Sequence, residues 1–226
     1  MPPCSAAHRR GFALPDLLAA LAVLSVIAAI VVTRAVASRE SAALTQCTAN
    51  LAKVNKAVLG FAEDHAQTLP NMVQGQGNLW WWYKEQVKRY AGITGDSSTN
   101  DIVFGCPRDR GYSDPIPFRL NGRFDYSSYV FNGVTLPGMP NIAGWRTSAV
   151  NRPNRTLLTM EWTAHAPLSW HRSRTGRNNM PFYSDAQSVV GFVDGHVAFS
   201  KIYYDGFNAA YTRDPIPGYD YQYSGN

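Results

Sequence analysis

Acidic residues and histidines in the second half of the chain are of the types that ligate metals or transfer protons. They are Glu161, His165, His171, Asp185, Asp194, His196 and Asp205. Their spacing matches neither a His-x-x-x-His pair nor the acidic ladder of a calcium-binding loop. The chain also lacks the Gly-x-Ser-x-Gly turn that presents a nucleophilic serine. We therefore predict no catalytic site and no cofactor, and keep Asp185 and Asp194 as the candidate ligands in case a metal binds.

The cysteines and the net charge narrow the possible classes of protein further. Cys4 lies in a segment that we expect to be removed, which leaves Cys47 and Cys106. An even pair in an exported domain predicts a disulfide, although two reduced, buried thiols would fit the same sequence. The net charge of +5 is modest, and Lys and Arg form no stripe with interleaved aromatic residues. Since nucleic-acid binding needs a concentrated basic face, we expect no nucleic-acid partner.

A long apolar run near the amino terminus is expected to act as a membrane anchor or an export signal for the rest of the chain. From Phe12 to Val32 only Pro15, Asp16 and Ser25 interrupt it. A helix of that length spans roughly 30 Å, the hydrocarbon core of a bilayer. Three interpretations fit: a secretory signal peptide cleaved near Ala35–Ser38, an uncleaved signal anchor, and a short basic leader cut off just before the run.

Asp16 separates these interpretations. A carboxylate inside a membrane span is costly, so it needs a partner or a function unless it lies near the interface. If the chain is cut between Gly11 and Phe12, Phe12 carries a new amino terminus and Asp16 becomes the fifth residue. An acid at that place can pair with the amine of a neighbouring subunit when helices pack in a filament. Pro15 is compatible with the helix because it falls in the first turn.

The stretch GFALPDLLAALAVLSVIAAIVV, from Gly11 to Val32, resembles the class III signal of type IV prepilins and type II secretion pseudopilins. Their pattern is Gly-Phe-Thr-Leu-Ile/Pro-Glu followed by an apolar helix. The resemblance implies that prepilin peptidase cleaves between Gly11 and Phe12 and methylates the Phe12 amine. This chain has Ala13 in place of Thr, and Asp16 in place of Glu, which keeps the charge but shortens its reach by one methylene.

The helix is expected to continue past the apolar run. Apolar residues recur three and four positions apart, at Leu44, Cys47, Leu51, Val54, Val58 and Phe61. This stripe is typical of a helix that buries one face. The opposite face is expected to hold Asn50, Lys53, Asn55, Lys56 and Glu63. One continuous helix from about Leu14 to His65 follows, and a disulfide from Cys47 to Cys106 would stabilise the fold by roughly 3–4 kcal/mol.

The sequence after this long helix predicts short helices and strands separated by turns. Residues 78–92 fit a short amphipathic helix, and at least one of its consecutive tryptophans, Trp80–Trp82, should be exposed. Strand-like runs lie within Asp101–Gly111, Phe124–Val134, Arg155–Trp162 and Ser188–Ile202. The last run contains Asp194-Gly195, a strong hairpin signal. The predicted fold class is α+β, with a long helix packed on a small antiparallel sheet.

Four elements resemble a bacterial family of prepilin-like proteins with a carboxy-terminal processing-associated domain. They are Cys106–Asp109, Ser128–Asn132, Glu161 and Phe192–Val197. The family motif includes Asp194, Gly195 and His196, together with a His that has nine residues between it and the Asp-Gly pair. Ser184 occupies that position here, and the nearest upstream histidine is His171.

These patterns predict a leader at 1–11, a long helix at 12–66 with 12–33 in the membrane, and an α+β head at 67–226. The expected function is a structural subunit of a type IV pilus-like or type II secretion pseudopilus filament. The chain would cross the bacterial inner membrane once, with its head in the periplasm or in an extracytoplasmic filament. Its expected partners are prepilin peptidase, other pilin or pseudopilin subunits, and membrane lipid. No cofactor is expected, and if a metal binds, the resemblance favours calcium, which some pseudopilins hold in a carboxy-terminal loop.

Two further hypotheses use the same anchor. A membrane-tethered ligand- or carbohydrate-binding module is suggested by Trp80–Trp82 and by the tyrosines of the tail, Tyr211, Tyr219, Tyr221 and Tyr223. Aromatic rings of this kind can stack on sugars or lie on a partner. The third hypothesis is a metal-dependent enzyme.

Overall fold

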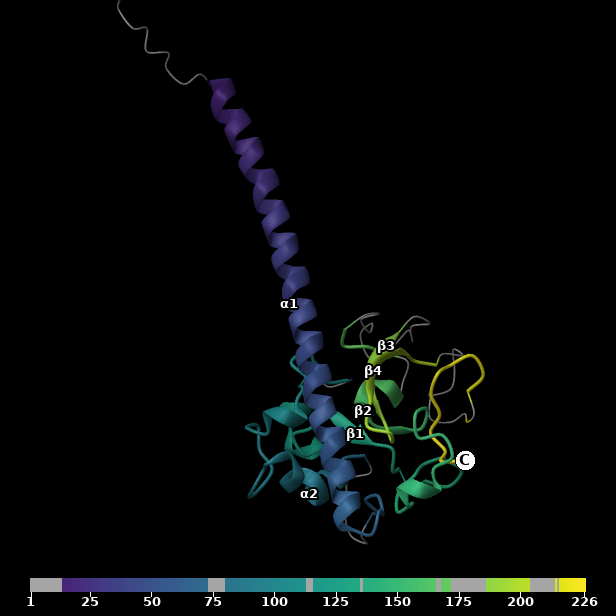
Figure 1. Cartoon of the computed structure of the whole chain (residues 1–226). Coiled ribbons are helices and arrows are strands. Elements are labelled where there is room, and N and C mark those ends of the chain that lie inside the picture. The colour runs from purple at the N-terminus through teal and green to yellow at the C-terminus, as the bar shows by residue number, and fades with distance from the viewer. Residues whose placement is uncertain are drawn as a thin grey trace, which may run out of the picture. The chain divides into compact units, whose positions relative to one another are not determined.

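The structure is a computed structural model that describes residues 14–72, 80–112, 116–134, 136–165, 168–171, 186–203, 214 and 216–226. The chain divides into two compact units between Ala42 and Ala43, inside the first helix. A long helix and a small antiparallel sheet give the α+β layout that the sequence predicts (Figure 1).

Helix α1 runs from Leu14, the first described residue, to Asp64, which lies within two residues of the predicted ends at His65 and residue 66. It ends where Ala66 and Gln67 take positive φ angles of 53° and 63°. The Gln67 N–H then donates to the Ala62 carbonyl at 2.8 Å, which satisfies one of the last carbonyls of the helix.

The amino-terminal part of α1 is apolar on all sides. Every residue from Leu14 to Arg39 is exposed within the chain, including the large side chains of Leu17, Leu24 and Ile30. By its length and composition, this is a helix that can cross a membrane. It is compatible with a single-pass membrane protein.

Four strands form one antiparallel sheet in the order β1-β2-β3-β4. They are β1 (Tyr129–Phe131), β2 (Leu157–Glu161), β3 (Gln187–Phe192) and β4 (Val197–Lys201). Each strand pairs with the next one along the sequence, so the sheet is a meander. The predicted hairpin is the β3–β4 pair, in which Gly195 adopts a positive φ of 98° in the connection.

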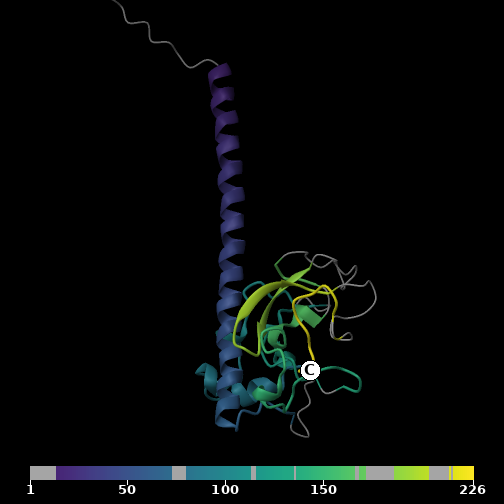
Figure 2. The same ribbon diagram turned by 45° about the vertical axis from the view of Figure 1, so that its right-hand side comes forward.

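The carboxy-terminal part of α1 belongs to the second unit and lies beside the sheet in both views (Figures 1 and 2). Its buried residues run from Cys47 to Ala62 and include Leu51, Val54 and Val58 of the predicted stripe. They join β1, β2 and β3 in one hydrophobic core.

Asn50 and Asn55 were expected on the exposed face of this helix, and that expectation is wrong, because both are buried. The Asn55 amide donates to the Phe192 carbonyl at 2.9 Å, and its Oδ1 accepts from Thr159 Oγ1 at 2.8 Å. A Cβ at Gly191 would lie 2.7 Å from that Oδ1, so the strand needs glycine where the asparagine approaches it.

The run after Asp101 is not the predicted strand but a 3-10 helix, Ile102–Phe104. Ile102 O accepts from the Gly105 N–H within this turn, and Ile102 O and Gly105 O both accept from the Asn50 side chain. Helix α2 (Tyr83–Val87) and the 3-10 helix Lys88–Ala91 form the predicted amphipathic segment, which ends at Gly92 with φ 81°.

We predict that Asn55→Ala lowers the free energy of unfolding of the second unit by about 2 kcal/mol, because Thr159 and Phe192 lose a buried hydrogen-bond partner. The readout is urea unfolding of the full chain in detergent, followed by tryptophan fluorescence. All six tryptophans lie after Ala43, so the signal reports this unit. The matched control, Lys56→Ala on the exposed face, should change stability by less than about 0.5 kcal/mol. Equal stability of the two variants would contradict the prediction.

Candidate functional site around the disulfide

The processing site of the predicted leader, Gly11 and Phe12, lies outside the described residues. Asp16 and Pro15 lie in the first turn of α1. A carboxylate in a first turn is stabilised by the helix dipole, and Pro needs no N–H there.

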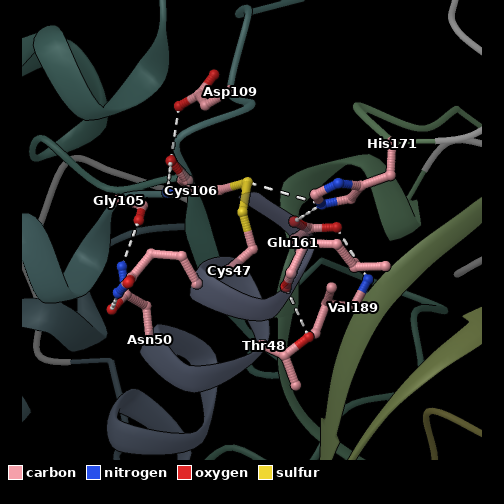
Figure 3. Close-up of a disulfide and its surroundings, with 12 residues drawn as sticks. Cys47, Thr48, Asn50, Gly105, Cys106, Asp109, Glu161, His171 and Val189 are labelled. Atoms are coloured by element: carbon pink, nitrogen blue, oxygen red, sulfur yellow. Dashed lines mark hydrogen bonds and ion pairs between the residues drawn. A yellow bond between two sulfur atoms is a disulfide. The ribbon is translucent and has the colours of Figure 1, made fainter. Parts of the chain in front are cut away.

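Cys47 and Cys106 form a disulfide that joins α1 to the loop after the 3-10 helix Ile102–Phe104 (Figure 3). Both cysteines are fully buried. One turn along the helix, the Asn50 amide donates to Ile102 O at 3.0 Å and to Gly105 O at 2.8 Å. The loop that carries Cys106 is therefore attached to α1 by one covalent bond and two hydrogen bonds.

Glu161, at the end of β2, points toward the disulfide (Figure 3). Its side chain is fully buried, and Oε2 accepts from the Val189 N–H at 2.9 Å. Oε1 lies 2.9 Å from His171 Nε2, and the same nitrogen lies 3.7 Å from Cys106 Sγ. Since an ionised carboxylate only accepts hydrogen bonds, the Nε2–H is the donor to it.

The geometry of His171 bears on what this cluster can do. In a nucleophile–His–acid triad, one ring nitrogen faces the nucleophile and the other faces the acid. Here a single nitrogen faces both the sulfur and the carboxylate. A proton relay through the ring is excluded in this arrangement. The atoms that converge are instead sulfur, nitrogen and carboxylate oxygen, the atoms that bind transition metals.

Ser128, Tyr129 and Asp109, three of the motif residues that carry the resemblance, gather beside this cluster. Ser128 Oγ accepts from the Cys106 N–H at 2.9 Å and donates to Asp109 Oδ2 at 2.7 Å. The Tyr129 hydroxyl donates to the Cys47 carbonyl at 3.1 Å. Asp109 is buried, which raises the pKa of its carboxyl, while its hydrogen bonds to Gly111 N and Ser128 act in the opposite direction. These residues thus form a hydrogen-bonded support around Cys106.

Asn132, at the end of the same motif, supports another part of the fold. Its amide donates to the carbonyls of Leu157 and Tyr223, which ties the carboxy-terminal tail to β2. Asp194 and His196 lie in the β3–β4 connection, with His196 Nδ1 2.6 Å from Asp194 Oδ1 and both side chains partly exposed. The structure therefore places these two away from the buried cluster. Asp185 and Ser184 lie outside the described residues.

The expectation of an exposed tryptophan is wrong. Trp81 and Trp82 are buried, and Trp80 is half-buried, with its ring 4.2 Å from that of His165. The three residues occupy a turn before α2, so their side chains do not alternate as they would in a strand. Tyr221 and Tyr223 are buried as well.

Sequence reasoning missed the buried ammonium of Lys84. Its side chain is fully buried and pairs with Asp101 at 2.8 Å, and it also donates to the Asp125 carbonyl. The sequence places Lys84 on an amphipathic helix, where lysine is normally exposed. The Lys84 ammonium can be buried because Asp101, which the fold brings beside it, neutralises its charge.

The chain was compared with known families, curated proteins and solved structures. No family model matches the chain. No match is found among curated proteins or among solved structures either.

We predict that the double variant Cys47→Ser/Cys106→Ser loses about 4 kcal/mol of stability in the second unit, because the unfolded chain regains the entropy of a long open loop. Urea unfolding monitored by tryptophan fluorescence measures the loss. Cys4→Ser is the matched control and should leave the unfolding curve unchanged. A double variant as stable as the parent would show that the disulfide contributes nothing to folding.

His165 gives a pH-dependent contribution to stability. Burial lowers its pKa from 6.5 to about 3. The unfolded chain takes up this proton below pH 6.5, whereas the folded chain does so only near pH 3. The contribution is complete above pH 6.5 and falls by about 1.4 kcal/mol per pH unit as the pH drops toward 3.

We therefore predict that, between pH 7 and pH 5, the free energy of unfolding falls by about 2 kcal/mol more in the parent than in His165→Phe. Burial also raises the pKa of Asp125 to about 6, which stabilises the folded state as the pH falls through that value. Both proteins contain Asp125, so this effect cancels in the difference. Parallel stability–pH curves for the two proteins would contradict the prediction.

Proposed function

We propose that the chain is a structural subunit of a type IV pilus-like or type II secretion pseudopilus filament, anchored in the bacterial inner membrane. The observation that carries the proposal is the amino-terminal part of α1, which exposes large apolar side chains on every side. An apolar surface of this size has to be covered by lipid before assembly and by other helices or lipid afterwards.

Asp16 supports assembly more than simple anchoring. It is the single acidic residue between Leu14 and Arg39 and lies in the first turn of α1. In the proposed filament, it pairs with the methylated Phe12 amine of a neighbouring subunit. Such a pair supplies the partner that a carboxylate in an apolar environment requires.

The disulfide supports a location outside the cytoplasm, because disulfides persist in oxidising compartments. A head tied covalently to the helix also suits a filament subunit, since pulling on the helix then loads the core of the head. The alternative is a tethered carbohydrate-binding module. Of the aromatic residues that suggested it, Trp81, Trp82, Tyr221 and Tyr223 are buried.

Amino-terminal mass spectrometry of the native membrane protein tests the proposal. A peptide beginning at methylated Phe12 is the expected result. A mature chain that begins at Met1, or after Ala37, in cells with active prepilin peptidase would contradict it. In a strain that lacks prepilin peptidase, the leader should stay attached.

A second prediction separates assembly from processing. Asp16→Asn should still be cleaved and methylated but should fall at least tenfold in the sheared filament fraction, because the neutral amide cannot form the ion pair. Asp16→Glu is the matched control and should assemble at least as well as the parent. Incorporation of Asp16→Asn at the parent level would rule out this role for Asp16.

A further inference from the structure

We propose that Cys47, Cys106, Glu161 and His171 bind one zinc ion when the disulfide is reduced, and that the disulfide is the metal-free form of the same site. This inference concerns the second unit alone and does not depend on the filament proposal. It rests on the position of four potential ligands at the junction of α1, the Cys106 loop and the end of β2 (Figure 3).

The ligand atoms are close enough for a single ion. One donor atom from each of the four residues lies within 4.8 Å of all the others, and three of the four residues are buried. Tetrahedral zinc, with bonds of about 2.0–2.3 Å, separates its ligand atoms by about 3.3–3.8 Å. The Cys106 Sγ to His171 Nε2 distance is already 3.7 Å, so small side-chain movements complete the site.

The ligand types favour zinc over the calcium that the resemblance implies. Two thiolates, one imidazole nitrogen and one carboxylate oxygen form a four-ligand set of the kind that zinc accepts, whereas calcium takes six or more oxygen ligands. The candidate calcium ligands Asp185 and Asp194 are not part of this set. The set came together only through tertiary structure, since its members are widely separated in the sequence.

Surrounding groups hold Glu161 and the backbone of both cysteines in place, as is usual for metal sites. The Val189 N–H holds Glu161 Oε2, which leaves Oε1 directed at His171. Ser128 Oγ holds the Cys106 N–H, and the Tyr129 hydroxyl holds the Cys47 carbonyl. These ligands are therefore pre-positioned with or without the bond between the sulfurs.

The exchange between the two forms balances as a two-electron reaction. A dithiol reductant supplies two electrons and two protons, so its own disulfide forms while the Cys47–Cys106 bond breaks to two thiols. Zinc then displaces both thiol protons, because the thiolate is the ligand. The His171 ring changes tautomer at the same time, so that its proton moves from Nε2 to Nδ1 and the bare Nε2 can bind the ion. Oxidation by a disulfide reverses both steps and releases the ion.

The test uses the full chain in detergent with Cys4→Ser, so that only the two site thiols remain. The chain is reduced with a phosphine, which removes the disulfide without adding a competing thiol, and is dialysed against zinc. We expect one zinc per reduced chain and none per oxidised chain. Cobalt in place of zinc should give a sulfur-to-metal charge-transfer absorption in the reduced chain alone.

Single variants assign the ligands. Glu161→Gln and His171→Ala should each weaken zinc binding by about 100-fold or more. His165→Phe, which changes another buried histidine of the same unit, should bind like the parent. Urea unfolding of the oxidised chain, followed by tryptophan fluorescence, checks that each variant folds, since a folded variant gives a cooperative transition. His171→Asn replaces any alanine variant that fails this check.

Three results would overturn the proposal. The first is a reduced parent that binds no zinc. The second is equal zinc binding by the oxidised and reduced parent, which would place the metal elsewhere. The third is parent-like affinity in both Glu161→Gln and the His171 variant, which would leave only the two thiols as ligands. The comparison of the reduced with the oxidised parent requires no variant, so it decides the redox part by itself.

Discussion

The burial of one face of α1, from Cys47 to Ala62, is the constraint on which the second unit depends. The four strands have only three to six residues each. The helix joins their core through Leu51, Val54 and Val58, all of which are fully buried. A small domain of this kind reaches stability by packing one long element against the sheet and by adding a covalent link.

Packing the helix in this way brings polar groups into the interior, and each of them has to be satisfied. Asn50 and Asn55 reach from α1 to the backbone of the Cys106 loop and of β3. Lys84 is neutralised by Asp101, and the Glu161 carboxylate is held by His171 and by the Val189 N–H. These bonds have specific geometry, so they select one position of the helix on the sheet, which apolar contacts alone would select less sharply.

Both parts of α1 are helical, but their apolar side chains are covered in different ways. After Ala43 the apolar face is covered by the chain's own core, and the polar residues that face inward have partners there. Before Ala42 the apolar side chains are exposed within the chain, so their cover must come from lipid or from other helices. The filament proposal follows from the first part of the helix. The zinc proposal follows from the second part, where the disulfide and its neighbours lie.

Local patterns in the sequence were sufficient for the elements whose causes are local. The length of α1, the apolar run, the helix at Tyr83–Val87 and the β3–β4 hairpin follow from periodicity, from Pro and Gly positions and from Asp194-Gly195. The other features were decided by tertiary structure alone, because the residues that produce them lie far apart in the chain. Asn50 and Asn55 are polar yet buried, because their hydrogen-bond partners lie far along the chain. The segment expected as a strand at Ile102 is a 3-10 helix whose Ile102 carbonyl accepts from Asn50. The meeting of Glu161, His171 and the two cysteines has no spacing signal, since only the packing of α1 on the sheet brings them together.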